Sequence, residues 1–185
     1  WGGWPASSGK SGDIDIETRG LVVRNGGMIR AGTGGLGDGG DIRVRTETLE
    51  MRDAGVIYTP AFGGSGDAGA IDVEAKSIVF SNENYPGYAT GMLSQASSPG
   101  TGDAGDIRVR TDSLEIAPGT EISTATWYTG KSGNIEIDVT GEASIRGTRD
   151  LNPWGDHITT GVFANTFGSG AAGRQRPFLA AGRVQ

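Results

Sequence analysis

Short stretches in which apolar and polar residues alternate recur along the whole chain. The clearest, Gly-Asp-Ile-Arg-Val-Arg-Thr, begins at Gly40 and returns unchanged at Gly105. Alternation with a period of two puts the β-branched residues on one face, so each stretch predicts a β-strand with one buried face. Aligned on Gly-x-Ile, the copies begin near residues 12, 40, 69, 105 and 133, and a degraded sixth copy begins near 173.

Each repeat divides into three strand-like pieces separated by turn residues. The residues expected to face inward in the first piece are Ile14/Ile16, Ile42/Val44, Ile71/Val73, Ile107/Val109 and Ile135/Ile137. Those of the second piece are Leu21/Val23, Leu49/Met51, Ile78/Phe80, Leu114/Ile116 and Ala143/Ile145. The inward column expected for the third piece is Ile29, Ile57, Leu93, Ile122 and Phe163. Its outward column is expected to be Met28, Val56, Met92, Glu121 and Val162.

Three strands per repeat, each pairing with its equivalent in the next repeat, predict an all-β fold, a parallel β-helix of about five to six coils. A single repeat cannot bury its apolar face, so the stacking of repeats creates the core. An antiparallel sandwich of short strands is the alternative, and it does not require identical columns at a fixed spacing. The chain is expected to divide into an N-terminal cap or junction (1–8), the β-helix repeats (9–173) and a C-terminal cap, junction or tail (174–185).

The residues that separate the inward-facing positions of the first piece change sign from one repeat to the next. They are Asp15/Glu17, Arg43/Arg45, Asp72/Glu74, Arg108/Arg110 and Glu136/Asp138. On a parallel stack, equivalent positions lie directly above one another, where opposite charges attract and like charges repel. We therefore expect an axial ladder of ion pairs that fixes the register, because a slip by one repeat would place acid on acid.

Composition narrows the classes of function. The 185 residues include 34 glycines, no cysteine and one histidine, and the net charge is −6. An acidic chain without a basic stripe is a poor match for nucleic acid. The lack of cysteine excludes disulfides and thiolate metal sites, and no segment is long and apolar enough for membrane insertion. Neither nucleic acid nor the interior of a membrane is an expected partner.

Two repeats replace the short corner with a longer loop, residues 81–91 and 147–161. Equivalent corners stack along one edge of a solenoid, so both loops are expected to project from the same side. The candidate ligand-binding residues on these loops are Tyr85, Tyr88, Asp150, Trp154, Asp156 and His157. Aromatic rings beside carboxylates can bind sugars, which makes a carbohydrate-binding or carbohydrate-active β-helix the alternative function. In the other interpretation the rings pack on the strands and fix their own loops.

The turn aspartates Asp38, Asp67 and Asp103 are candidates for weak Ca²⁺ binding. Calcium-binding nonapeptide repeats need tandem nine-residue copies, whereas this turn occurs once per repeat, so a solvent-facing turn is the plainer interpretation. Gly-Lys-Ser-Gly at Gly9 and at Gly130 lacks the upstream glycine and the following helix of a phosphate-binding loop. No other metal site, no cofactor and no catalytic residue is expected, and the chain is not predicted to be an enzyme.

The segment GDAGDIRVRTDSLEIAPGTEISTAT, from Gly102 to Thr126, resembles the repeat region of filamentous-haemagglutinin-like exoproteins, bacterial surface proteins exported by two-partner secretion. The resemblance extends over roughly residues 9–173. It implies a right-handed β-helical shaft, secreted or attached to the cell surface, that serves in adhesion, aggregation, filament assembly or the extracellular matrix. The implied partners are other copies of the protein, adjacent repeats of a longer chain, and cell-surface glycans. The family has no shared catalytic residues.

Overall fold

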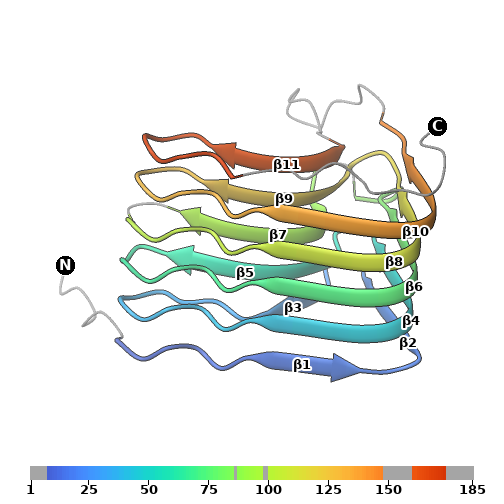
Figure 1. The fold of residues 1–185 in the computed structure, drawn as a ribbon, viewed down its shortest axis with the longest axis horizontal. Helices are drawn as coiled ribbons and strands as arrows, with labels where there is room; N and C mark the ends of the chain where they lie inside the picture. Colours follow the sequence, from blue (N-terminus) through green and yellow to red (C-terminus); the bar gives the residue numbers. More distant parts are fainter. Residues whose placement is uncertain (1–7, 86, 98–99, 148–159, 174–185) are drawn as a thin grey trace.

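The chain folds into parallel β-strands arranged in two sheets (Figure 1). A computed structural model describes residues 8–85, 87–97, 100–147 and 160–173. The six-stranded sheet contains β1 (Ile14–Glu17), β2 (Gly20–Arg24), β4 (Ile42–Arg52), β6 (Ile71–Ser81), β8 (Ile107–Ile116) and β10 (Ile135–Ile145). The five-stranded sheet contains β3 (Met28–Arg30), β5 (Val56–Phe62), β7 (Thr90–Ser97), β9 (Thr120–Thr126) and β11 (Gly161–Thr166).

Strands follow chain order in both sheets, β1-β4-β6-β8-β10 with β2 also pairing β4, and β3-β5-β7-β9-β11. Every pairing between these strands is parallel, and Figure 1 shows the repeats stacked in sequence from β1 to β11. The predicted all-β class with parallel strands is therefore confirmed. In the described part of the chain, no helix is long and apolar enough to cross a membrane.

The core combines the columns predicted for the first and second pieces with an inner column of the third piece, which includes Ile57 and Ile122. Ile42 pairs with Ile14 on one side and with Ile71 on the other, and Leu49 likewise pairs with Leu21 and Ile78. The largest fully buried side chains include Phe80, which lies between Met51 and Ile116 in its column. Each such side chain contributes about 1.5–3 kcal/mol when it leaves water, so the stacked columns provide the main stabilisation.

The first two pieces of a repeat form one continuous strand from the second repeat onward, where the sequence predicted two. In β4 the buried positions change from Ile42 and Val44 to Leu49 and Met51, so the inward side changes from even to odd positions. The change takes place at the exposed pair Glu47 and Thr48. The strand thus turns a corner with its pairing continuing on both sides of it, and the three expected pieces lie in two sheets.

The expected register of the third piece is wrong in two repeats. Met92 and Val162 lie in the inner column with Ile29, Ile57 and Ile122. The positions beside Tyr58 and Ser123 are instead occupied by Leu93 and Phe163.

The physical reason is the residue at which each strand begins after a long loop. Gly91 and Gly161 take the place that Val56 and Glu121 have in the other repeats, and both have φ of 139°. A side chain at Gly91 would collide with the carbonyl oxygen of Glu121. The loops therefore end on a glycine inside the sheet, and the strand register begins one position earlier than the sequence pattern suggests.

Glycine recurs in the turns because the main chains of successive repeats approach closely there. A Cβ added to Gly40, Gly69, Gly105 or Gly133 would overlap the carbonyl oxygen of the equivalent glycine in the preceding repeat. A second column, Gly66, Gly102, Gly130 and Gly170, has the same geometry. These two columns explain the repeated Gly-x-x-Gly motif, since any side chain there would force the repeats apart.

We expect Gly69→Ala and Gly105→Ala to lower the free energy of unfolding by about 1–3 kcal/mol or more, because the new methyl group collides with main chain rather than with a side chain that can move. Gly12→Ala is the matched control, since Gly12 begins the same column and has nothing within 4 Å of its added Cβ. Urea unfolding of the three variants measures the difference. Equal losses at Gly12 and Gly69 would contradict the close-approach explanation.

Candidate functional site

The outer face of the first piece has two columns of charged side chains. In register order the first is Asp15, Arg43, Asp72, Arg108 and Glu136, and the second is Glu17, Arg45, Glu74, Arg110 and Asp138. Each residue has a neighbour of opposite sign in the adjacent strand. We call this set the charge ladder.

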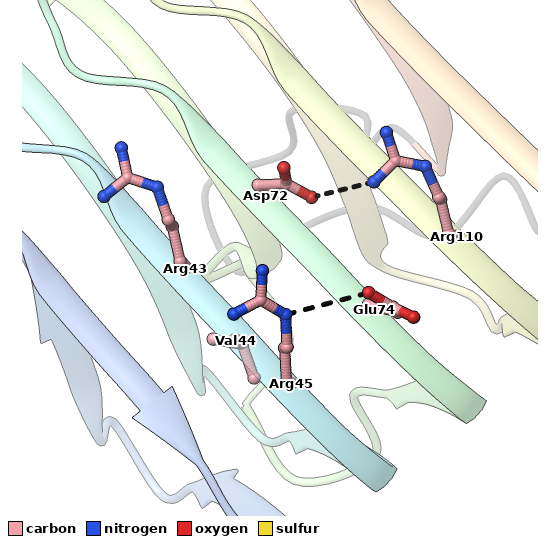
Figure 2. Close-up of a pocket in the computed structure, with 6 residues that line it drawn as sticks. All are labelled: Arg43, Val44, Arg45, Asp72, Glu74 and Arg110. Atoms are coloured by element: carbon pink, nitrogen blue, oxygen red, sulfur yellow. Dashed lines mark ion pairs between the residues drawn. The ribbon is translucent and has the colours of Figure 1, made fainter.

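Ion pairs connect the ladder both along and across its columns. Arg43 lies 3.7 Å from Asp15, and Arg108 lies 3.6 Å from Glu136. The guanidinium of Arg45 is 3.8 Å from Glu74, while Arg110 reaches diagonally to Asp72 at 3.6 Å (Figure 2). These side chains are exposed, so each pair contributes about 0.2–1 kcal/mol. Their combined effect is a preference for one register.

Carboxylates from the preceding turn extend the ladder at its edge. Arg43 also pairs with Asp13 at 3.4 Å and with Asp41 at 2.9 Å. The backbone N–H of Asp41 donates to Asp13, and this hydrogen bond together with Arg43 holds the pKa of the Asp13 carboxyl below its usual value. Arg43 also donates a hydrogen bond to Asp13, and this bond raises the pKa of the Arg43 guanidinium. Both groups therefore stay charged across the physiological range.

A second charged column lies at the corner of the long strands, and the sequence reasoning missed it. Its members stand seven positions after the repeat glycine, in the order Arg19, Glu47, Lys76, Asp112 and Thr140. Lys76 Nζ lies 3.0 Å from Glu47 Oε1, and Thr140 Oγ1 donates to Asp112 Oδ1 over 2.7 Å. The signs alternate here too, in the opposite phase to the charge ladder. The fixed offset from glycine was the signal that could have revealed this corner column.

Two hollows lie over these charges. One, of about 30 Å³, is lined by Arg43, Val44, Arg45, Asp72, Glu74 and Arg110 (Figure 2) and has room for about one or two waters. The other is a depression of about 370 Å³ at the corner, with Glu74, Lys76, Arg110, Asp112 and Asp138 among its lining residues. Acids and bases alternate around both, so neither presents one sign of charge to a ligand.

The turn aspartates considered for calcium bond to the next repeat instead. Oδ1 of Asp38 accepts the N–H of Asp67 at 3.1 Å, and Oδ1 of Asp67 accepts the N–H of Asp103 at 2.7 Å. Asp103 in turn accepts the N–H of Lys131 at 2.7 Å. The residues that the structure describes include no group of three or more side chains placed to bind a metal ion. These carboxylates hold successive turns together, a role that the sequence reasoning did not assign to them.

Of the six candidate ligand-binding residues, the structure describes two. Tyr85 and Tyr88 are 41% and 57% exposed, and the N–H of Tyr88 donates to the carbonyl of Tyr85. Asp150, Trp154, Asp156 and His157 lie outside the described residues. Binding of a ligand by the two loops stays a prediction.

The base of the loop at 81–91 is fixed to its neighbours. Asp53 accepts the backbone N–H groups of Glu83 and Asn84 and the side-chain amide of Asn84, and these bonds lower the pKa of the Asp53 carboxyl. Nδ2 of Asn82 donates to the carbonyls of Tyr88 and Gly119. The loop is therefore attached to the repeats on both sides while its two tyrosine rings face solvent.

Exposed aromatic rings also gather at the far end of the five-stranded sheet. Trp127 and Phe167 stack with their ring centroids 5.4 Å apart and their planes 24° apart. Phe62 is partly exposed, and the guanidinium of Arg30 lies 5.4 Å from its centroid. The ring contacts stabilise the turns in which these side chains lie. The exposed parts of the rings, and the side chain of Tyr128, stay accessible to a partner.

Glu121 has the one carboxyl group among the described residues whose pKa is raised by burial, to about 7. It occupies the outward column of β9 between Gly91 and Gly161, neither of which has a side chain to pair with it. The residue is partly buried, and these two neighbours supply no compensating charge. Desolvation disfavours the ionised form of such a group.

Comparisons with known proteins find no similarity to this chain: no family model matches it, and neither does any curated protein or solved structure. The arguments about function therefore rest on the residues, on their geometry and on the sequence resemblance given above.

Reversing both arginines of one repeat tests the charge ladder. We expect Arg43→Glu/Arg45→Glu to lower the free energy of unfolding by about 1–2 kcal/mol at low salt, because acids would then face acids in β1 and β6, and most of the loss to disappear at high salt. Arg24→Glu is the matched control, since Arg24 pairs in register with Arg52 and its reversal creates an opposite pair. A loss in the control as large as in the double variant would argue against the ladder.

Glu121 predicts a pH dependence of stability. Its pKa in the folded chain is about 7 against an ordinary value of 4.5, so the folded state binds this proton more strongly than the unfolded state does. Its contribution to stability is complete below about pH 4.5 and is lost as the pH rises through about 7. We expect Glu121→Gln to gain about 1–3 kcal/mol relative to the unchanged chain at pH 8 and almost nothing at pH 4. Thermal unfolding across this pH range measures the gain, and a constant difference would count against the assignment.

Proposed function

We propose that this chain is a segment of a secreted, right-handed β-helical shaft that serves as a structural and adhesive module on or between cells. The observation behind this proposal is the register, in which equivalent residues stack repeat upon repeat from β1 to β10 and from β3 to β11. On this proposal the described strands make up five coils, and a sixth begins near Gly173. A connection between two parallel strands of the same sheet is right-handed in nearly all proteins, which supports a right-handed shaft.

The surface chemistry supports a structural role over a catalytic one. Glycosidic or lyase chemistry needs carboxylates or a base that converge on one substrate atom. Here the acids of the charge ladder face arginines, as in Arg45–Glu74 and Arg108–Glu136, and the turn aspartates accept main-chain N–H groups. Side chains engaged in this way stabilise the stack. The proposal is accordingly that the chain is not an enzyme.

The resemblance of residues 9–173 to filamentous-haemagglutinin-like repeats supports secretion and the cell surface as the place of action. A rigid stack with exposed rings on its loops and corners also suits contact with another surface, since recognition residues on solenoids lie on loops presented by a stiff scaffold. Tyr85 and Tyr88 on the loop, and Trp127 at the corner, are the exposed rings that such contact would use.

Adhesion of coated beads to cells tests this function. We expect beads that display the full chain to remain on a cell layer under flow in greater numbers than beads that display the same amount of albumin, because the stack presents accessible aromatic side chains to the cell surface. Tyr85→Ala/Tyr88→Ala beads test the loop, and Trp127→Ala beads test the corner. Retention no greater than that of albumin beads would overturn the adhesive role.

Mild periodate treatment of the cells distinguishes the partners in the same assay, since it oxidises glycans and leaves proteins largely intact. Loss of adhesion after periodate, together with loss in the tyrosine variant, would support carbohydrate binding by the loop at 81–91. Adhesion that persists after periodate would indicate a partner other than an oxidisable glycan.

A further inference from the structure

The segments that follow β5, β7, β9 and β11 stack along one edge of the molecule, where the chain leaves the five-stranded sheet (Figure 1, left). We call this surface the turn edge. Its four levels belong to the second, third, fourth and fifth repeats. In the part that the structure describes, these segments consist mostly of glycine, alanine, serine, threonine and aspartate. The few large side chains on the turn edge therefore stand out from a surface of small residues.

Aromatic rings form a column where these segments begin. Phe62 pairs in register with Ser97, Trp127 continues β9 beside Ser97, and Phe167 follows Trp127 in the next repeat. The three rings are 39%, 40% and 62% exposed. From the second repeat to the fifth, the column thus contains a ring, a serine and two rings. Exposed apolar side chains gathered along one edge indicate a surface for contact with another molecule.

A second column on the turn edge is charged. Its members each follow one of the closely stacked glycines Gly66, Gly102, Gly130 and Gly170, and they are Asp67, Asp103, Lys131 and Ala171. The side chain of Asp103 is partly buried and that of Lys131 is exposed. From the second repeat to the fifth, the signs of this column are minus, minus, plus and zero.

Both columns become complementary to themselves when a second copy lies against the turn edge in the antiparallel direction. A two-fold axis between the third and fourth repeats makes the third repeat of each copy face the fourth repeat of the other. Trp127 then lies opposite the small side chain of Ser97, and Phe62 lies opposite Phe167. In the charged column, Lys131 of each copy lies opposite Asp103 of the other. Size and charge therefore match across the same axis.

Other positions of the axis lose this match. An axis through the third repeat places Asp103 opposite Asp103, and an axis through the fourth places Lys131 opposite Lys131. An axis between the second and third repeats places Asp67 opposite Asp103. Like charges that face each other across an interface cost free energy, so the charged column selects one placement of the second copy.

We propose that the turn edge is a dimerisation surface, on which a second copy of this chain docks antiparallel about a two-fold axis between the third and fourth repeats. The inference rests on the stacked shaft of the proposed function and adds the partner of its corner rings. Shafts that project from two facing surfaces run in opposite directions, so this contact joins them side by side. Tyr85 and Tyr88 belong to the connection between β6 and β7 and stay available for contact with a cell.

Sedimentation velocity over a range of concentrations tests the dimer. The unchanged chain should form dimers as its concentration rises. We expect Trp127→Ala and Lys131→Glu each to weaken the dimer by at least about tenfold, because the first removes a ring from the contact and the second places acid opposite acid. Arg24→Glu makes the same change of charge in β2, away from the turn edge, and should leave the dimer unchanged.

Two results would contradict the proposal. One is a chain that stays monomeric at every concentration, and the other is a loss in Arg24→Glu as large as in Lys131→Glu. The side chain of Lys131 is exposed, so its replacement tests the contact without disturbing the core.

Cross-linking tests the direction of the second copy, since the chain has no cysteine of its own. Ser65 and Ser169 are exposed and precede Gly66 and Gly170, so within one copy they lie three repeats apart, on the order of 14 Å. In the antiparallel dimer, Ser65 of one copy faces Ser169 of the other. Under mild oxidation, a mixture of Ser65→Cys and Ser169→Cys chains should form covalent dimers, whereas neither variant should do so alone.

An absence of cross-links in the mixture, or equally fast cross-linking of either variant alone, would overturn the antiparallel arrangement. Both experiments are made in solution without cells, whereas retention of beads under flow tests the adhesive role. A chain that dimerises without adhering, or adheres without dimerising, therefore separates the failure of one proposal from the failure of the other.

Discussion

Close stacking of main chain on main chain is the constraint on which this structure depends. Parallel strands lie about 4.8 Å apart, and in the turns the peptide groups approach so closely that Gly69 and Gly105 have no room for a side chain. Turns cannot form a full strand ladder, so aspartates such as Asp67 and Asp103 bond to the N–H of the next turn. Register is therefore specified in the turns as well as in the strands.

Once the repeats are stacked, each outward side chain mainly meets its equivalents in the two neighbouring repeats. Charge then encodes the register. In the charge ladder, Arg43 and Arg45 lie between acidic repeats, and the corner column with Glu47 and Lys76 alternates in the opposite phase. Each repeat thus carries both signs, which keeps repulsion within a repeat low. A slip by one repeat would reverse every contact in both columns, so individually weak pairs act together.

The sequence was sufficient for the core and insufficient after the loops. Alternation identified the columns of Ile42 and Leu49, because their inward positions are apolar in every repeat. In the third piece, Met92 and Leu93 are adjacent and both apolar, so alternation could not decide which faces inward. The deciding feature was the tight position of Gly91, a contact between distant segments. For the two loops the sequence identified six candidate ligand-binding residues, and the structure describes two of them, Tyr85 and Tyr88.

The alternating ladder has a consequence for the ends that does not apply to its interior. Inside the stack, every acidic repeat has arginines on both sides, and its charge is locally compensated. Among the strands that the structure describes, β1 and β10 each have a ladder neighbour on one side only. A stack that begins and ends on the same sign keeps that property when repeats are added in pairs, and a single added repeat reverses one end. The parity of the repeat number therefore determines whether identical stacks attract or repel at their ends.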